Sequence, residues 1–232
     1  MSDETLVLVP GLLCTRALFG AQIAALAPAR RIIVADHTRD DAMAAIAGRL
    51  LAGAPDRFAL VGLSMGGYVA LETMRQAPGR VTRLALLDTT ARPDTAETRE
   101  RRLGQIAAAQ SGRLAAVLDE LWPRLVHPGR HGDAALLEVV RAMMQDTGAE
   151  GFVRQSRAIL GRPDSRPQLE RIRCPTLVLV GDGDVITPPE VAQEIADAIA
   201  GARLSVLPGV GHASSIEAPE QVTRELVQFL SS

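Results

Sequence analysis

The chain of 232 residues, with an apolar fraction of 47% and a net charge of −2, is long enough to bury a substantial core as one globular domain. The balanced charge supplies no overall basic surface, so nucleic acid is not an expected partner. No apolar run approaches the ~18 residues that cross a bilayer, and residues 3 and 4 are acidic where a signal peptide would be basic, so we expect a cytoplasmic protein without a membrane partner.

Short apolar runs alternate with helical patterns over the first 90 residues. Four runs predict strands, at residues 5–9, 31–35, 58–63 and 83–88. The first run is continuous and is ended by Pro10 and Gly11, which is typical of a strand buried on both faces. Apolar residues at helical spacing follow the first three strands, and Asp40 or Asp41 is a suitable N-cap for the second of these helices.

The alternation breaks between residues 91 and 168, where the pattern is helical throughout. Its breaks predict four helices, near residues 95–109, 112–122, 133–146 and 150–160. Strands are predicted again at 175–180 and 203–207, and helices at 189–199 and 219–230. The helical segment is too long for an ordinary loop, so we expect it to be a lid over the carboxyl ends of the strands, where open α/β sheets bind ligands.

Six short strands joined by helices predict an α/β fold with a parallel, doubly wound sheet and helices on both faces. Residues 1–90 and 169–232 form the predicted core. Residues 91–168 form the helical lid, inserted between strands four and five, and we expect the core and the lid to fold as a single unit.

The segment Gly62–Gly67 is a G-x-S-x-G motif between a predicted strand and a predicted helix, which is the context of a nucleophile elbow. Such a turn forces the serine into a sparsely populated backbone conformation, so Gly62 and Gly66 must be very small. It places the Ser64 hydroxyl at the end of the sheet, beside a helix N-terminus that favours developing negative charge. Two phosphate-binding patterns, G-x-x-x-x-G-K-[ST] and G-x-G-x-x-G, are absent, which leaves a purely structural turn as the alternative.

His212 is the expected general base for Ser64. It follows the sixth strand on the Gly-rich loop 208–213, which allows the imidazole to swing over the serine. The remaining histidines are in loops, where a side-chain hydrogen bond is the ordinary role: His37, His127 and His131.

The acid that orients His212 should follow the fifth strand. Asp184 stands far enough beyond the strand for its loop to bend back toward a histidine. Asp182 lies closer to the strand and is better suited to capping the turn through nearby N–H groups. Asp88, at the end of the fourth strand, is an alternative acid, although capping the loop into the lid is the favoured role for it.

Two backbone N–H groups are needed to bind an oxyanion. One is expected from Met65, the residue after the serine. The other is expected from Leu12 in the first loop, where Gly11 would let the backbone approach the reacting centre. Taken alone, this loop would be no more than a strand-terminating turn.

The order Ser64, Asp184, His212 and four segments of the chain resemble the α/β-hydrolase superfamily. The segments are residues 8–14, 62–67, 181–188 and 211–212. One departure is Pro10-Gly11, where many members carry His-Gly; it removes a polar side chain and leaves the backbone donors. A second is the short N-terminus, which leaves no room for the leading β-hairpin of the family and implies a six-stranded, wholly parallel sheet.

The resemblance implies a serine hydrolase, similar to esterases, that cleaves a small carboxylic ester or lactone through an acyl-enzyme. Ser64 attacks the carbonyl, His212 takes its proton, and Asp184 orients the imidazole. The N–H groups of Met65 and Leu12 bind the oxyanion. C–C bond hydrolysis, acyl transfer, perhydrolysis and non-catalytic ligand binding on the same fold remain alternatives.

No cofactor or metal is expected. The two cysteines, Cys14 and Cys174, form neither a disulfide framework nor a metal-ligand cluster, and Cys14 follows a glycine turn that could bring it near the site. The only partner that the sequence indicates is a small-molecule substrate. The sequence does not indicate an oligomeric state.

The lid supplies the candidates for substrate contacts, with core packing as the alternative for its apolar residues. These candidates are Trp122, Leu125, His127 and Met144. A substrate carboxylate could be met by Arg124, His127 and Arg130, for which a solvated loop is the alternative.

Overall fold

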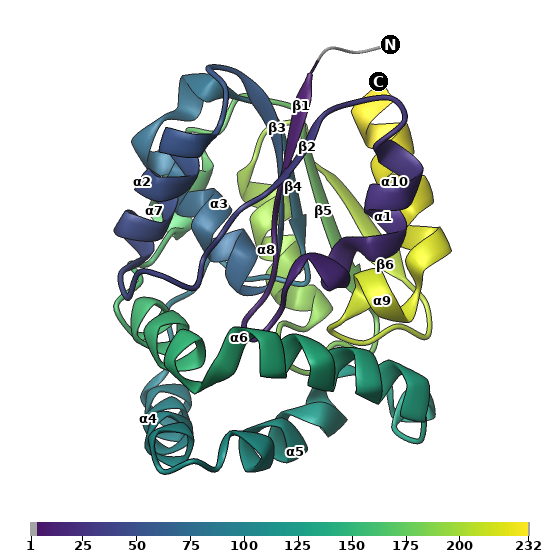
Figure 1. The fold of residues 1–232 in the computed structure, drawn as a ribbon. Coiled ribbons are helices and arrows are strands. Elements are labelled where there is room, and N and C mark those ends of the chain that lie inside the picture. Colours follow the sequence, from purple (N-terminus) through teal and green to yellow (C-terminus); the bar gives the residue numbers. More distant parts are fainter. Residues whose placement is uncertain (1–3, 232) are drawn as a thin grey trace.

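The computed structural model describes residues 4–231 and contains a six-stranded parallel sheet with strand order β2-β1-β3-β4-β5-β6 (Figure 1). The strands are β1 (Thr5–Val9), β2 (Ile32–Val34), β3 (Phe58–Leu63), β4 (Val81–Leu87), β5 (Thr176–Gly181) and β6 (Arg203–Leu207). Strands β1, β3 and β5 are buried along their whole length, whereas the edge strands β2 and β6 are partly exposed. The predicted six-stranded parallel sheet is confirmed.

Helices cover both faces of this sheet (Figure 1). One face is covered by α1 (Gly20–Leu26) and α10 (Pro219–Ser231), and the other by α2 (Met43–Gly53), α3 (Met65–Gln76) and α8 (Pro189–Ala198). Strand β1 shows why: Leu6 and Leu8 join one hydrophobic cluster while Val7 and Val9 join the other, because side chains alternate along a strand. Sequence periodicity does not anticipate the short helices η2 (Pro78–Arg80), α7 (Arg166–Leu169) and α9 (Ser214–Glu217). The helical pattern expected after the first strand begins in η1 (Arg16–Phe19) and continues in α1.

The lid helices lie between β4 and β5 in the chain and cross the carboxyl ends of the strands (Figure 1). They are α4 (Ala96–Gln110), α5 (Leu114–Leu125), η3 (Pro128–Arg130) and α6 (Ala134–Leu160). Helix α5 continues through Pro123, where a break was expected. The two helices expected on either side of residue 148 form the single element α6, which is kinked where Gly148 adopts φ 68° and ψ 169°.

The N-cap prediction for α2 is wrong. The helix begins at Met43, and Ala42 occupies the cap position without a side-chain hydrogen bond. The Asp40 carboxylate instead accepts two hydrogen bonds from the Arg49 guanidinium, at 2.6 and 3.0 Å. The Asp40 carboxylate, which the local pattern assigned to the N-terminus of the helix, therefore forms an ion pair with Arg49 instead.

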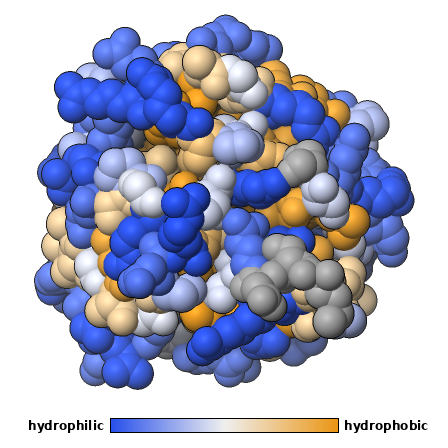
Figure 2. All heavy atoms as spheres, turned by 90° about the horizontal axis from the view of Figure 1, so that it is seen from above, coloured by the Kyte–Doolittle hydropathy of each residue, from blue (hydrophilic) through white to orange (hydrophobic). Residues whose placement is uncertain are grey.

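Figure 2 shows the end of the sheet opposite the lid, where hydrophilic residues spread over most of the surface and apolar residues lie between them. Over the described part of the chain the exposed large apolar residues are scattered along the sequence: Leu103, Val139, Val185, Val206 and Val227. No helix within residues 4–231 combines the length and the apolar character of a membrane span.

Candidate active site

Ser64 occupies the sharp turn between β3 and α3. Its φ of 55° and ψ of −114° lie outside the regions that ordinary residues populate. Two hydrogen bonds hold the turn: the Ser64 N–H donates to the Leu87 carbonyl at 2.9 Å, and the Thr89 hydroxyl donates to the Ser64 carbonyl at 2.8 Å. The strained geometry of a nucleophile elbow is thus fixed by the end of the neighbouring strand β4.

The glycines at positions 62 and 66 are required by space. A Cβ atom on Gly62 would collide with the Gly66 carbonyl, and one on Gly66 would collide with the Val9 carbonyl. Both obstacles are backbone atoms, which cannot rotate away. At Gly11, by contrast, a Cβ would make ordinary 3.5 Å contacts with the Leu63 carbonyl oxygen and with Ser64 Cβ, so the close approach of this loop does not demand glycine.

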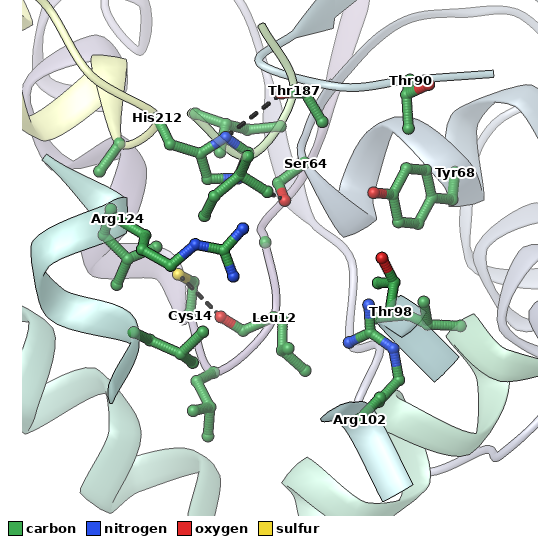
Figure 3. Close-up of a pocket in the computed structure, with 18 of the residues that line it drawn as sticks. Leu12, Cys14, Ser64, Tyr68, Thr90, Thr98, Arg102, Arg124, Thr187 and His212 are labelled. Atoms are coloured by element: carbon green, nitrogen blue, oxygen red, sulfur yellow. Dashed lines mark hydrogen bonds between the residues drawn. The ribbon is translucent and has the colours of Figure 1, made fainter. Parts of the chain in front are cut away.

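Ser64, His212 and Asp184 form one hydrogen-bonded chain. The Nε2 atom of His212 lies 2.8 Å from Ser64 Oγ, and its Nδ1 atom lies 2.7 Å from Asp184 Oδ2. A carboxylate can only accept, so the imidazole proton belongs on Nδ1 and Nε2 is free to accept the serine proton. Figure 3 shows the imidazole facing Ser64, with Thr187 beside it.

Asp184 is buried and held by its own loop. Its Oδ1 accepts from the N–H groups of Ile186 and Thr187 at 2.8 and 2.9 Å, and its Oδ2 accepts from the Thr187 hydroxyl at 2.7 Å. Burial raises the pKa of Asp184, but His212 and these hydrogen bonds outweigh burial and leave the pKa below its usual value. The carboxylate is therefore ionised at neutral pH.

The buried His212 responds in the opposite sense. Burial lowers its pKa, whereas the charge of Asp184 and the hydrogen bond to it raise the pKa, and the net result lies above the usual value for histidine. Asp184 thereby stabilises the imidazolium that forms when His212 takes a proton.

The two other aspartates near the strand ends have structural partners. Asp182 accepts from the Gly209 N–H at 2.8 Å, so it holds the start of the histidine loop instead of capping its own turn as predicted. Asp88 is buried, accepts from the Gly181 N–H at 3.2 Å and from the Ser214 hydroxyl, and adopts a φ of 45°. It thus ties together the loops that carry Asp184 and His212 rather than capping the entrance to the lid.

Backbone strain is concentrated around this site. Over the described residues, the non-glycine positions with positive φ are Leu13, Ser64 and Asp88. Each of them follows the carboxyl end of a strand, β1, β3 or β4. Strain of this kind persists only where the surrounding structure enforces it, and it clusters at functional sites.

The expected oxyanion donors are the backbone N–H groups of Met65 and Leu12. Met65 is the first residue of α3, so its N–H has no acceptor within the helix. Leu12 lines the cavity in front of Ser64, on the loop that follows β1. Their role as a donor pair remains a prediction.

A buried polar network holds the first loop against the lid. The Leu13 N–H donates to Gln155 Oε1 at 3.1 Å, and Gln155 lies on α6. His37 Nε2 lies 2.9 Å from the Gly11 carbonyl oxygen and 3.1 Å from the Gln155 amide nitrogen. A carbonyl can only accept, so Nε2 carries the proton and donates to Gly11, and the Gln155 amide packs beside it.

A cavity of about 280 Å³ opens in front of Ser64. It is bounded by the first loop, the strand ends and the inner faces of α4, α5 and α6. Leu125 is among the residues that line it, and its contact with a substrate remains a prediction. Its volume lies near the lower end of the range for ligand pockets and suits a small substrate.

The other three lid candidates do not line this cavity, which corrects the prediction for them. The Trp122 indole N–H donates to the His131 carbonyl at 3.0 Å. The His127 ring accepts from the Gly129 N–H at 3.1 Å, within its own loop. Met144 is buried in the main hydrophobic cluster, and its neighbour Met143 reaches the cavity instead.

The two arginines predicted to bind a substrate carboxylate lie in different places. Arg124 lines the cavity, whereas Arg130 pairs with Asp133 at 2.9 Å.

Cys14 also lines the cavity. Burial raises the pKa of Cys14 to about 12, so its thiol stays protonated at neutral pH. Within residues 4–231 no cluster of three or more histidine, cysteine or carboxylate side chains is placed to hold a metal ion.

Some residues of the site were missed in the sequence. Thr187 follows Asp184 by three positions, a spacing at which side-chain and backbone groups meet in a tight turn, so a search for that turn could have found it. Gln155 and Arg101 stand in helical patterns without any signal that distinguishes them from neighbouring polar residues.

Comparison with known proteins places this geometry in a family. Residues 6–225 match the model of the alpha/beta hydrolase family. A thermophilic esterase from Thermogutta terrifontis has a similar structure, with a TM-score of 0.90 and 30% identity over 99% of this chain and 90% of that one. The enol-lactonase from Burkholderia xenovorans LB400 also has a TM-score of 0.90, with 27% identity over 100% of this chain and 93% of that one.

A protein with a similar sequence is also named as an esterase. The pimeloyl-[acyl-carrier protein] methyl ester esterase of Nitrosomonas europaea is 29% identical over 179 residues, which cover 72% of this chain and 69% of that protein. Because the family model spans nearly the whole chain, including both the serine turn and the histidine loop, the chain belongs to the alpha/beta hydrolase family.

Proposed function

We propose that this hydrolase cleaves a small carboxylic ester or lactone through an acyl-enzyme formed on Ser64. The observation that carries the proposal is the position of the His212 imidazole, which contacts Ser64 Oγ at 2.8 Å and Asp184 Oδ2 at 2.7 Å. The esterases and the enol-lactonase among its relatives support the same class of bond.

The first half-reaction forms the acyl-enzyme. Ser64 Oγ attacks the carbonyl carbon while its proton passes to His212 Nε2. His212 then gives this proton to the alcohol oxygen as the bond between that oxygen and the carbonyl carbon breaks. In a lactone the alcohol stays attached to the acyl group through the opened ring.

The second half-reaction releases the acid. A water molecule attacks the acyl carbon and loses a proton to His212, and Ser64 leaves with that proton. In both halves the negative charge on the carbonyl oxygen is met by the N–H groups of Met65 and Leu12. Removing one such donor typically lowers turnover ~10²–10³-fold.

A panel of 4-nitrophenyl esters, from acetate to octanoate, tests the proposal. Wild-type protein should hydrolyse the short acyl chains best, because the cavity is only about 280 Å³. Ser64→Ala should lower kcat/KM on the order of 10⁴–10⁶-fold. His212→Gln should have a comparable effect, whereas the matched control His131→Gln, which changes a histidine outside the cavity lining, should keep wild-type activity.

Covalent labelling and product analysis complete the test. A fluorophosphonate should label Ser64 in wild-type protein and leave Ser64→Ala unlabelled. Folded protein that turns over no chain length and is not labelled would overturn the proposal. Free acid should be the main product even when methanol or peroxide competes with water, and a dominant methyl ester or peracid would replace hydrolysis by acyl transfer or perhydrolysis.

Two further proposals concern the whole molecule. We infer that the lid and the core fold as one unit, because Met143 and Phe152 of α6 belong to the same hydrophobic cluster as Leu6 and Leu63 of the sheet. We also retain a reducing cytoplasm as the proposed location, since Cys14 and Cys174 are both free thiols.

A further inference from the structure

Five arginines line the cavity in front of Ser64, and three of them have carboxylate partners. Arg102 and Arg162 both pair with Asp94, at 2.9 and 2.8 Å. Arg92 pairs with Glu194 at 2.8 Å, outside the cavity lining. Each of these three guanidinium groups therefore contacts a carboxylate, although Arg102 and Arg162 share the single charge of Asp94.

Arg101 on α4 and Arg124 on α5 differ from these three arginines because neither contacts a carboxylate of the described residues. Both line the cavity, and within residues 4–231 no carboxylate lies at salt-bridge distance from either guanidinium. Arg124 is attracted only from longer range, by Glu120, Asp184 and Glu97. Glu120 also accepts a hydrogen bond from the Gln105 amide at 2.9 Å. The cavity therefore holds two positive charges that the protein leaves uncompensated at contact distance.

The two charges are close enough to act on one another. Burial, and next the charge of Arg101, hold the pKa of Arg124 below the usual value for arginine. Guanidinium groups keep their charge at neutral pH, so the repulsion between these two destabilises the empty cavity. An anion bound in the cavity would offset this repulsion.

Arg124 is also positioned relative to the reacting groups. It stands in the last turn of α5, next to Leu125, which lines the cavity too. Figure 3 shows its guanidinium pointing into the cavity, on the side where Ser64, His212 and Leu12 lie. Its charge is felt at His212, where it opposes the effect of Asp184 on the imidazole pKa.

We propose that Arg124, with Arg101 in the lining of the same cavity, binds a carboxylate carried by the substrate, so that the preferred substrates are anionic: monoesters of small dicarboxylic acids, or lactones that bear a carboxylate. This inference rests on the proposed hydrolysis at Ser64 and specifies its substrate class. A guanidinium binds a carboxylate through two parallel N–H···O bonds, which fixes orientation as well as position. The apolar walls around Leu125 and Met143 strengthen such a pair by excluding water.

A matched pair of esters tests the inference. Mono-4-nitrophenyl glutarate and 4-nitrophenyl pentanoate have acyl chains of equal length, and only the first ends in a carboxylate. Wild-type protein should prefer the glutarate monoester in kcat/KM by a factor of about 10–100, the effect of one or two hydrogen bonds between charged groups. The ratio of the two kcat/KM values is the readout, since it cancels general damage to the site.

Arg124→Gln should lower this ratio by about 10-fold or more, and Arg101→Gln should lower it by a smaller factor. Arg124→Lys keeps the charge without the two-bond geometry and should retain part of the preference. Arg157→Gln is the matched control, because Arg157 is an exposed lid arginine outside the cavity lining, and its ratio should equal that of wild type. A wild-type protein without preference, or an unchanged ratio in Arg124→Gln, would overturn the inference.

The inference and the proposed hydrolysis can fail separately. Ser64-dependent turnover of both esters at equal rates would leave the hydrolase standing and remove the carboxylate site. If neither ester is turned over and Ser64 is not labelled, the proposed function fails. Titration calorimetry with glutarate then tests, independently of hydrolysis, whether the cavity binds a carboxylate. Binding that Arg124→Gln weakens about 10-fold supports the site, and absent or unchanged binding overturns it.

Discussion

His212 Nε2 lies 2.8 Å from the hydroxyl oxygen of Ser64, although 148 positions separate the two residues in the chain. Ser64 follows β3 and His212 follows β6, and the strands β4 and β5 stand between these two in the sheet. The histidine loop must therefore cross the ends of two strands. It is held there because the Gly183 N–H donates to the Val210 carbonyl at 2.9 Å and the Gly211 N–H donates to Glu217 Oε1 at 3.0 Å.

The pH dependence of activity should report the Asp184–His212 pair. In the proposed mechanism His212 must be neutral to take the serine proton, so kcat/KM should fall as the pH drops through the pKa of His212 in the folded enzyme. Burial lowers that pKa and Asp184 raises it to a net value above about 6.5. The acid limb should therefore lie above pH ~6.5 in wild-type protein.

Asp184→Asn provides the comparison. It removes the charge that raises the His212 pKa, so the acid limb should move to lower pH while kcat falls on the order of 10⁴-fold. Profiles of kcat/KM against pH at constant ionic strength measure both effects. An acid limb that stays in place would mean that another group titrates.

Asp88 should tolerate asparagine and not alanine. Burial, and next the charge of Asp184, raise the pKa of Asp88, which favours the neutral carboxyl that asparagine mimics. Asparagine also accepts the positive φ of this position. Asp88→Asn should keep most activity, whereas Asp88→Ala leaves the Gly181 N–H and the Ser214 hydroxyl unpaired, at a cost of about 1–3 kcal/mol for each.

A comparison of Asp88→Asn with Asp184→Asn decides which acid orients the histidine. Activity on a 4-nitrophenyl ester and the midpoint of urea unfolding are the two measurements. If Asp88→Asn lost as much activity as Asp184→Asn, Asp88 would have to be the acid, in conflict with the 2.7 Å contact between His212 Nδ1 and Asp184 Oδ2.

Gln155→Leu should impair turnover from a position on the lid. The substitution removes the acceptor of the Leu13 N–H and so loosens the loop that carries the Leu12 N–H. We expect kcat to fall by up to ~10²-fold, with a smaller change in KM, because the proposed oxyanion donor Leu12 would act mainly in the transition state.

Ser156→Ala is the control for that experiment. Ser156 is as buried as Gln155, and its hydroxyl has no hydrogen-bond partner among the described residues. Its removal should leave kcat unchanged and should not lower thermal stability. Equal losses of kcat in the two variants would indicate general lid damage instead of a loop effect.

Two glycine-to-alanine substitutions should have opposite effects on stability. In Gly66→Ala the new Cβ would collide with the Val9 carbonyl, so the free energy of unfolding should fall by about 3 kcal/mol or more. In Gly104→Ala, on the exposed face of α4, nothing lies within 4 Å of the new Cβ, and the free energy of unfolding should rise by about 0.5–1 kcal/mol. Urea unfolding monitored by circular dichroism distinguishes the two.

Predictions from the sequence succeeded where short-range patterns carry the information. The six strands and the strand-to-helix turn at Ser64 depend on residues a few positions apart, and the structure contains them at nearly the expected bounds. The lid was harder, because helix ends there depend on tertiary contacts: α5 runs through Pro123, and a break expected at Gly148 is a kink within α6.

The sequence by itself determined the order of the candidate catalytic residues along the chain. A serine flanked by glycines follows one strand, an aspartate follows another, and a histidine follows the last. Only the tertiary structure decided which lid side chains face that chemistry, since a small rotation of a packed helix exchanges neighbouring residues between cavity and core. Leu125 lines the cavity and Trp122 does not. Likewise Arg102 forms an ion pair with Asp94, which also contacts Arg162, while Arg101, the preceding residue in the chain, has no carboxylate of the described residues at contact distance. Ion pairing depends on where another segment of the chain brings its carboxylate.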